Sequence, residues 1–313
     1  MRSVILAPPM QTAQAAAENR TGVWLVERNG SAESYSNGLR IDNSFAVSNT
    51  PRPSFRVLTL EAGTPERRES KPVGIVYHTT ESKQAPFVAD QNRNLQRISV
   101  EVLNLVRNQH SYHFFIDRFG RVFRVVQEDH VAFHAGHSVW AGPEGAYVNL
   151  NGSFLGIAFE MQTEPGRDQP SATQAQIGAG RMLTEMLRAR YNLPAANCVT
   201  HAQVSVNPVN MRIGYHTDWA GNFPFTGLGL EDNYAAPPAS LWLFGFDYDP
   251  VYIQSTGARL LPGLQLAETQ LAAHAARLNL SVEQYKSALR KHYKEIAAAA
   301  HGGGTATETT HEN

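Results

Sequence analysis

Two histidines in this sequence stand at the ends of short uncharged segments. His78 closes the run Val-Gly-Ile-Val-Tyr-His, and His201 closes the run Asn-Cys-Val-Thr-His. Runs of this kind are typical of buried strands, and open α/β sheets bind their ligands at strand ends. His216 and Asp218 follow in a loop, separated by one residue. Two imidazoles and one carboxylate, with water in the fourth position, would form an open tetrahedral zinc site of the catalytic type.

A hydrolytic site also needs a proton acceptor, and Glu160 is the acid that the sequence offers. It is the single carboxylate in the apolar run of residues 154–161, and burial there would raise its pKa into a useful range. Each residue alone has a commoner structural explanation: a core histidine, a salt bridge for Glu160, and an Asx turn or helix cap for Asp218. Their occurrence together at the ends of core strands favours a functional site.

Composition limits the class of protein. The chain has 313 residues, with 27 Lys and Arg against 28 Asp and Glu, so neither a basic face for nucleic acid nor an acidic tail is indicated. Its length suits one large domain or one domain with additions. The one cysteine, Cys198, excludes an internal disulfide, and its position three residues before His201 predicts a core side chain on the opposite face of the strand. No apolar run reaches membrane-spanning length, and no clear signal peptide is visible.

Periodicity and turn residues predict the surrounding elements. Two Asn-Gly pairs predict a small β-meander within residues 22–41, and apolar spacing predicts an amphipathic helix over residues 91–108. A strand, a turn and a returning strand are expected within residues 112–126. A capping box from Ser171 to Gln174 predicts a helix that ends near residue 191. We expect this domain order: a disordered arm (1–20), the meander and a linker (21–70), a catalytic domain (71–230), a connection (231–262), C-terminal helices (263–298) and a disordered tail (299–313).

The C-terminal helices have a start signal of their own. Ser281 and Gln284 have the spacing of a capping box, and Leu280 with Tyr285 is placed to form a hydrophobic staple. We expect these helices to pack on the main domain or on each other.

Together these residues resemble the zinc-dependent N-acetylmuramoyl-L-alanine amidases of the peptidoglycan-recognition-protein and phage-lysozyme amidase family. Each matching segment is weak alone, but all recur in family order across about half the chain. The segments are residues 76–80 (VYHTT), 111–120 (SYHFFIDRFG), 132–136 (AFHAG), 155–160 (LGIAFE) and 200–201 (TH), followed by Asp218 and residues 224–225 (PF).

The resemblance implies an α/β fold in which helices flank a mixed central β-sheet, here with the N-terminal β-meander and a C-terminal helical extension. It also implies one Zn²⁺ per chain, held by His78, His201 and Asp218, with Glu160 as the catalytic carboxylate. In such a site Tyr112 would lie near the zinc water. The expected substrate-binding residues are His134, in the wall of the groove, Thr79 and Trp219.

The sequence departs from the family pattern at His216, because the family usually has Lys or Arg two residues before the third ligand. His216 would then stabilise the oxyanion by donating an N–H or, when protonated, as a cation. The loop from His201 to Asp218 is also longer than in compact family members. We assign Asp218 as the third ligand, because His216 then occupies the lysine position; the reverse assignment stays open.

The implied function is zinc-dependent hydrolysis of the amide between N-acetylmuramic acid and L-alanine, in peptidoglycan or its fragments. The expected partner is a peptidoglycan or muropeptide substrate, with no nucleic acid and no membrane span. A cell-envelope or secreted location is favoured over the cytoplasm. Two alternatives stay open: a non-catalytic peptidoglycan-recognition module, and a zinc amidase or peptidase with another substrate.

Overall fold

The computed structural model describes residues 22–59, 67–163, 172–207, 209–257 and 260–301. The predicted N-terminal arm and residues 302–313 of the predicted tail lie outside these ranges. Residues 299–301, which were assigned to the tail, belong instead to the last helix. No helix of the described ranges is long and apolar enough to cross a membrane.

An eight-stranded mixed sheet forms the centre of the molecule, in the order β1-β2-β3-β8-β7-β11-β6-β12. Strand β6 contains the predicted His78 segment and lies between β11 and β12, which both run parallel to it. The strands are β1 (Leu25–Asn29), β2 (Ala32–Tyr35), β3 (Arg40–Asp42), β6 (Gly74–Thr79), β7 (Phe114–Ile116), β8 (Val122–Arg124), β11 (Phe154–Phe159) and β12 (Cys198–Thr200).

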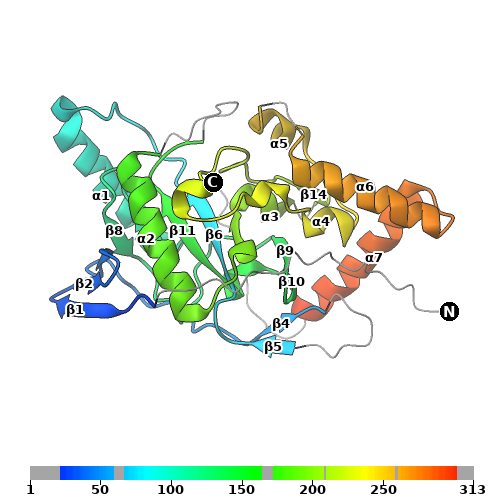
Figure 1. The fold of residues 1–313 in the computed structure, drawn as a ribbon, viewed down its shortest axis with the longest axis horizontal. Helices are drawn as coiled ribbons and strands as arrows, with labels where there is room; N and C mark the ends of the chain where they lie inside the picture. Colours follow the sequence, from blue (N-terminus) through cyan, green and yellow to red (C-terminus); the bar gives the residue numbers. More distant parts are fainter. Residues whose placement is uncertain (1–21, 60–66, 164–171, 208, 258–259, 302–313) are drawn as a thin grey trace.

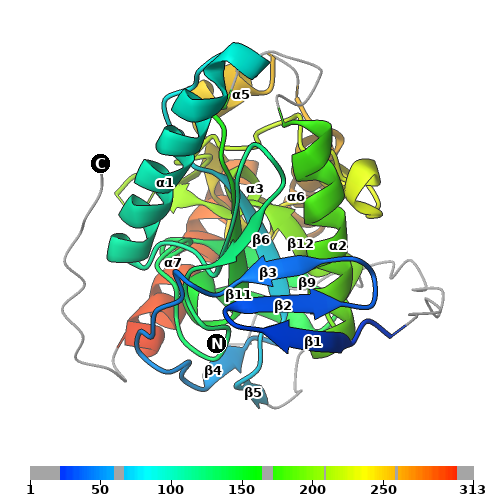
Figure 2. The same cartoon turned by 90° about the vertical axis from the view of Figure 1, so that its left-hand side faces the viewer.

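Helices cover both faces of this sheet, as Figure 2 shows for α1 (Asn92–Gln109) and α2 (Gln174–Tyr191). Side chains alternate along β6, so Ile75 and Tyr77 pack in the core beneath α2, whereas Val76 and His78 face the other side. Cys198 is fully buried in the core beneath α2, as predicted. The predicted capping box of α2 is displaced by two residues.

The observed N-cap of α2 is Thr173, whose hydroxyl accepts from the Gln176 N–H, and the Gln176 side chain accepts from the Thr173 N–H. The predicted first residue of the box, Ser171, lies outside the described residues. Thr173 also donates to the Arg118 carbonyl at 2.9 Å. This tertiary contact holds Thr173 at the start of α2.

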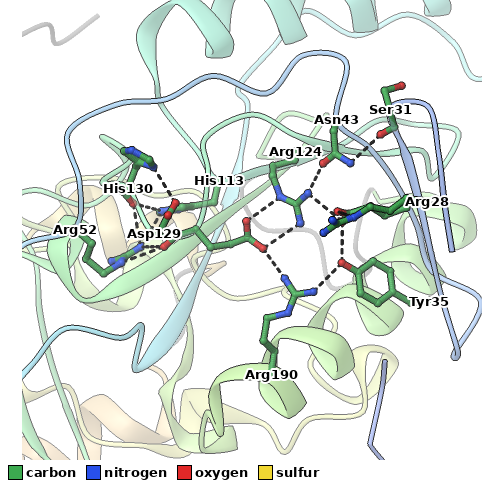
Figure 3. Close-up of polar contacts among 12 residues, drawn as sticks. Arg28, Ser31, Tyr35, Asn43, Arg52, His113, Arg124, Asp129, His130 and Arg190 are labelled. Carbon is green, nitrogen blue, oxygen red and sulfur yellow. Dashed lines mark hydrogen bonds and ion pairs between the residues drawn. The ribbon is translucent and has the colours of Figure 1, made fainter. Parts of the chain in front are cut away.

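The predicted N-terminal β-meander is present and extends the central sheet, because β3 pairs in parallel with β8. Figure 3 shows the polar contacts that hold it there. Arg124 of β8 donates to Glu33 of β2 at 3.1 Å and to Glu128 at 2.8 Å, and all three side chains are buried. Arg190 of α2 donates to the Glu128 carboxylate at 3.0 Å and to the Tyr35 hydroxyl at 2.8 Å. The meander is therefore tied to the sheet and to α2 by a buried ion-pair network.

The C-terminal part packs on the loop that follows β12. Strands β13 (Val206–Asn207) and β14 (Arg212–Ile213) form a hairpin within this loop, and β15 (Asp247–Tyr248) pairs with β14. Apolar residues of the loop share a core with those of the C-terminal helices. Figure 1 shows these helices at the end of the molecule opposite to β1 and β2. They are α4 (Ala239–Trp242), α5 (Pro250–Ser255), α6 (Pro262–Arg277) and α7 (Val282–His301).

The start of α7 is as predicted, because Ser281 and Gln284 form both hydrogen bonds of the capping box. Two further strand pairs flank the main sheet, and a short helix follows β12. These elements are β4 (Phe55–Val57) with β5 (Arg67–Glu69), β9 (Val139–Gly142) with β10 (Gly145–Val148), and α3 (His201–Val204).

Candidate metal centre

Three of the predicted residues meet at the carboxyl ends of β6 and β12. Candidate ligand atoms of His78, His201 and Asp218 all lie within 4.8 Å of one another, and the three residues are buried. Asp218 Oδ2 is 3.3 Å from Nδ1 of His78, and Asp218 Oδ1 is 2.9 Å from Nδ1 of His201. Two imidazole nitrogens and a carboxylate that converge in this way fit the ligand preference of zinc.

Strand register places the two histidines side by side. Thr200 of β12 lies beside Tyr77 of β6, so the next residue on each strand is a histidine, and the two rings have centroids 4.4 Å apart. His201 is the first residue of α3, and the helix is capped by Thr200 with Gln203. Asp218 reaches the same point from the long loop, where its carbonyl accepts from the Ala202 N–H at 3.3 Å.

A chain of hydrogen bonds behind His78 fixes which of its nitrogens carries the proton. Nε2 of His134 lies 3.3 Å from the Phe154 carbonyl, which can only accept, so Nε2 carries a proton and Nδ1 is an acceptor. Nδ1 of His134 lies 3.1 Å from Nε2 of His78, which must then be the donor. The Nδ1 lone pair of His78 is therefore free to face Asp218 and a metal ion.

The residues around His134 are tightly packed. A Cβ on Gly156 of β11 would lie 2.7 Å from Cγ of His134, so a larger residue at position 156 would displace the ring. The backbone N–H groups of His134 and Ala135 both donate to Oδ1 of Asn151, at 2.8 and 2.6 Å. His134 therefore lies within the protein against His78 and is 7% exposed, which is a different setting from the predicted groove wall.

Burial keeps the imidazoles of His78 and His134 neutral. Burial, together with the neighbouring His201, lowers the pKa of His78 to about 4. Burial also lowers the pKa of His134 well below its usual value. At Asp218 burial opposes the charge, but the imidazoles of His201 and His78 outweigh it and hold the pKa of this carboxyl well below its usual range. Neutral imidazoles and an ionised carboxylate are the protonation states that metal binding requires.

Tyr112 and His216 border the three-residue group. The Tyr112 ring lies 5.0 Å from the His78 ring, and burial, with smaller contributions from Asp218 and Glu81, raises its pKa, so its hydroxyl stays a proton donor at neutral pH. The exposed His216 ring stacks on His201 with centroids 4.4 Å apart and planes 17° apart. Both rings contact candidate ligands, and their catalytic roles stay predictions.

Glu160 lies on the same face of the sheet as His78, two residues beyond Ala158, which pairs with His78. Its Oε2 accepts from Ser99 Oγ at 2.6 Å and from the Arg118 N–H at 3.3 Å. Burial is the main cause that raises its pKa. Among the described residues, its hydrogen-bond partners do not include the three candidate ligands. The catalytic role of Glu160 stays a prediction.

Two residues that were expected to bind substrate are buried. Trp219 is 1% exposed and lies in the core, where its indole N–H donates to the His78 carbonyl at 3.0 Å. This contact positions the end of β6, and the ring has no surface to offer a substrate. Thr79 is 3% exposed, and its hydroxyl donates to the Glu81 carboxylate.

The sequence reasoning missed Glu81 and Gly156. Glu81 follows His78 by three residues, and its exposed carboxylate also accepts from the Thr163 N–H at 2.9 Å, so it joins the ends of β6 and β11. Its position three residues after the first histidine was the available signal. The sequence signal for Gly156 was weaker, because it was only a glycine within an otherwise apolar strand.

Sheet, helices and site together form an α/β domain with a mixed central sheet and a candidate metal centre at its strand ends. Residues 68–219 match the family Amidase_2, described as N-acetylmuramoyl-L-alanine amidase. This match supports N-acetylmuramoyl-L-alanine amidase activity on peptidoglycan fragments. A comparison with curated proteins found no match.

Solved structures with a related fold include several amidases. AmpDh3 from Pseudomonas aeruginosa, in complex with anhydromuramic pentapeptide, is 21% identical over 52% of this chain and 64% of its own, with a TM-score of 0.38. The amidase AmiD from E. coli is 20% identical over 69% of this chain and 82% of its own, with a TM-score of 0.39. Drosophila PGRP-LB is 11% identical over 52% of this chain and 85% of its own, with a TM-score of 0.31.

Proposed function

We propose that this protein is a zinc-dependent N-acetylmuramoyl-L-alanine amidase. It hydrolyses the amide between the lactyl group of N-acetylmuramic acid and L-alanine, in peptidoglycan or its fragments. The observation that supports this most directly is the buried group of His78, His201 and Asp218 within the segment that matches the family. A zinc ion held by these three residues would polarise the scissile carbonyl and lower the pKa of a bound water to about 7.

The chain's own groups supply the other functions. The hydrogen-bond chain through His134 presents the Nδ1 lone pair of His78. The Tyr112 hydroxyl and an N–H of His216 are hydrogen-bond donors beside the ligands, where the substrate oxygen gains charge during attack by water. Proton transfer from water to the leaving amine is assigned to Glu160, because burial raises its pKa toward the working range of a general base.

The test is mass spectrometry of the products from purified sacculi and from N-acetylmuramoyl-L-alanyl-D-glutamate, with and without a chelator. We expect release of peptides with a free L-alanine amine, complete loss of this activity in the chelator, and recovery with zinc. An Asp218→Asn variant should lose zinc and activity together. Binding of sacculi without cleavage would contradict the proposal and indicate a recognition module. Cleavage at another bond would indicate a different amidase or peptidase.

The role of Glu160 needs a separate comparison. Glu160→Gln should keep zinc and lose about 10²- to 10⁴-fold in rate, as expected for a general base. Glu81→Gln is the matched control, because it removes the carboxylate at the neighbouring strand end. Near-normal turnover of Glu160→Gln, with a large loss in Glu81→Gln, would move the assignment to Glu81.

We propose a cell-envelope or secreted location, because intact peptidoglycan lies outside the cytoplasm. Fractionation of the producing cells should recover the protein outside the cytoplasm. Recovery in the cytoplasm would indicate recycled muropeptides as the substrate.

A further inference from the structure

Asn233 and Tyr234 connect the two segments that carry His201 and Asp218. They are the first two residues of the short helix η5 (Asn233–Ala235), and Asp232 caps this helix by accepting from the Tyr234 N–H at 3.0 Å. Both side chains are buried, with 9% and 6% exposed. The segment that matches the family ends at residue 219, so both residues lie beyond it.

Asn233 is bound to the residues around His201. Its side-chain amide donates to the carbonyl of Cys198 in β12 at 2.9 Å. Its own carbonyl accepts from Nε2 of Gln203 at 2.9 Å, and Oε1 of the same glutamine accepts from the Thr200 N–H at 2.9 Å. These three partners lie within three positions of His201, on both sides of it. Asn233 therefore fixes the end of β12 and the start of α3, where His201 stands.

Tyr234 is bound to the turn that follows Asp218. Its hydroxyl donates to the Trp219 carbonyl at 2.5 Å and accepts from the Phe223 N–H at 3.1 Å, so it closes this turn. Trp219 has a left-handed backbone, with φ at 58°, which a bulky residue adopts only when its surroundings impose it. Its indole N–H donates to the carbonyl of His78, another candidate ligand. The Tyr234 hydroxyl therefore stabilises the backbone conformation directly after Asp218.

The long loop gives this link its importance. Asp218 follows His201 by 17 positions, and the β13–β14 hairpin lies between them. Along such a loop the chain alone does not fix the separation of the two side chains. Asn233 and Tyr234 are adjacent on one short helix, so their contacts relate the two segments directly. This link supports the 2.9 Å contact between Asp218 Oδ1 and Nδ1 of His201.

We propose that Asn233 and Tyr234 are positioning residues that hold His201 and Asp218 at the separation a metal ion requires. The inference rests on the proposed zinc amidase function and adds to it a part of the chain beyond the family match. Groups that orient metal ligands usually change metal affinity by about 10- to 100-fold when they are removed. Part of the segment 231–262, which the sequence predicts as a connection, then belongs to the metal centre.

Tyr234→Phe tests this inference, because it removes the hydroxyl and keeps the ring. We expect the dissociation constant for Zn²⁺, measured by competition with a chromophoric chelator, to rise about 10- to 100-fold. Tyr252→Phe is the matched control, because Tyr252 is fully buried in the C-terminal core and its hydroxyl has no hydrogen-bond partner within the described ranges. Its zinc affinity should equal that of the wild type. A purely structural role of Tyr234 would lower the free energy of unfolding and leave the zinc affinity of the folded protein unchanged.

Asn233→Ala tests the His201 side and decides the question if Tyr234→Phe does not fold. It should also weaken zinc binding by about 10- to 100-fold. Asn49→Ala is its control, because the Asn49 amide donates to a backbone carbonyl, that of Val131, outside these contacts. Its zinc affinity should stay at the wild-type value.

A measurement on the metal-free protein separates this inference from the amidase function. Hydrogen exchange of the Trp219 indole N–H reports its bond to the His78 carbonyl. We expect exchange at least about 10-fold faster in Tyr234→Phe than in wild type or Tyr252→Phe, because a lost bond worth about 1.4 kcal/mol is a factor of ten. Wild-type zinc affinity in both Tyr234→Phe and Asn233→Ala would overturn the inference and leave the amidase function intact. If the wild type binds no zinc, the proposed function fails and the indole exchange decides: faster exchange in Tyr234→Phe alone supports the positioning role, and equal exchange refutes it.

Discussion

Nε2 of His78 and Nδ1 of His134 lie 3.1 Å apart and form a hydrogen bond between two buried imidazoles. The other nitrogen of each ring faces an oxygen: Nδ1 of His78 lies 3.3 Å from the Asp218 carboxylate, and Nε2 of His134 lies 3.3 Å from the Phe154 carbonyl. A backbone carbonyl at one end of this chain thus determines the proton position at the other end, because each neutral ring has one donor and one acceptor. Partners that orient a ligand in this way usually affect metal affinity.

His134→Ala should therefore weaken zinc binding by about 10- to 100-fold, although His134 is not a ligand. Competition with a chromophoric chelator measures the affinity, and nitrogen chemical shifts of the metal-free protein report the tautomer of His78. The matched control is His130→Ala, because His130 pairs with the exposed Asp129 and lies outside this chain. Unchanged zinc affinity and an unchanged His78 tautomer would show that His134 only fills space.

Gly156→Ala tests the same chain without removing any of its members. The added Cβ would lie 2.7 Å from Cγ of His134, so the ring must move and its bond to His78 must lengthen. We expect weaker zinc binding and a less stable protein. Gly178→Ala is the control, because a Cβ there meets nothing within 4 Å, and alanine should stabilise helix α2 by up to about 1 kcal/mol. Equal zinc affinity in the two variants would contradict the account.

The attachment of the β-meander can be tested at Glu33. Glu33→Gln removes a buried partner of Arg124 and should lower the free energy of unfolding by on the order of 3 kcal/mol. Arg28 pairs with the same carboxylate at 3.0 Å, but its side chain is 69% exposed, so Arg28→Ala should cost less than about 1 kcal/mol. Denaturant unfolding measures both. Similar losses of unfolding free energy in the two variants would show that the buried ion pair stabilises the protein no more than the exposed one.

Much of this architecture follows from local sequence patterns. The uncharged runs before His78 and His201 predict two buried strands, because apolar β-branched segments of this kind are typical of strands that are covered on both faces. The spacing of apolar residues likewise predicts α1, observed at Asn92–Gln109. These predictions are confirmed because the residue pattern that specifies each helix or strand lies within that element itself.

Features that depend on distant contacts were not predictable in the same way. The pairing of β3 with β8 joins segments about 80 residues apart, and no local pattern specifies it. Trp219 follows a candidate ligand, yet its burial depends on packing against Phe159 and Phe223. A pattern of residue types cannot distinguish an aromatic ring in a groove from one in the core beneath it.

Acidity should destabilise the metal-free protein. The pKa of His78 is lowered to about 4, and burial lowers those of His113 and His134 well below the unfolded value of about 6.5. Below pH 6.5 the unfolded chain therefore binds protons that the folded protein excludes. Stability should fall as the pH decreases from about 6.5 toward 4, by up to about 1.4 kcal/mol per pH unit for each histidine.

Thermal unfolding of chelator-treated protein at pH 7 and at pH 5 measures this loss. Asp218 does not contribute to the difference, because its stabilising charge is lost only below its unfolded pKa of about 3.9. Equal melting temperatures at the two pH values would show that these imidazoles are not held neutral in the folded protein.

His216 and Asp218 compete for the role of third ligand, and the structure favours Asp218. The Asp218 carboxylate faces Nδ1 of both candidate ligand histidines, whereas the His216 ring stacks on His201 with nearly parallel planes. His216→Ala should therefore keep zinc and lose roughly 10²- to 10³-fold in kcat, the usual effect of one oxyanion donor. His216→Lys should be tolerated, because an ammonium group also donates to the oxyanion. Asp218→Ala should lose zinc. Zinc content and kcat, measured for all three variants, decide the assignment: loss of zinc in His216→Ala with retention in Asp218→Ala would make His216 the ligand.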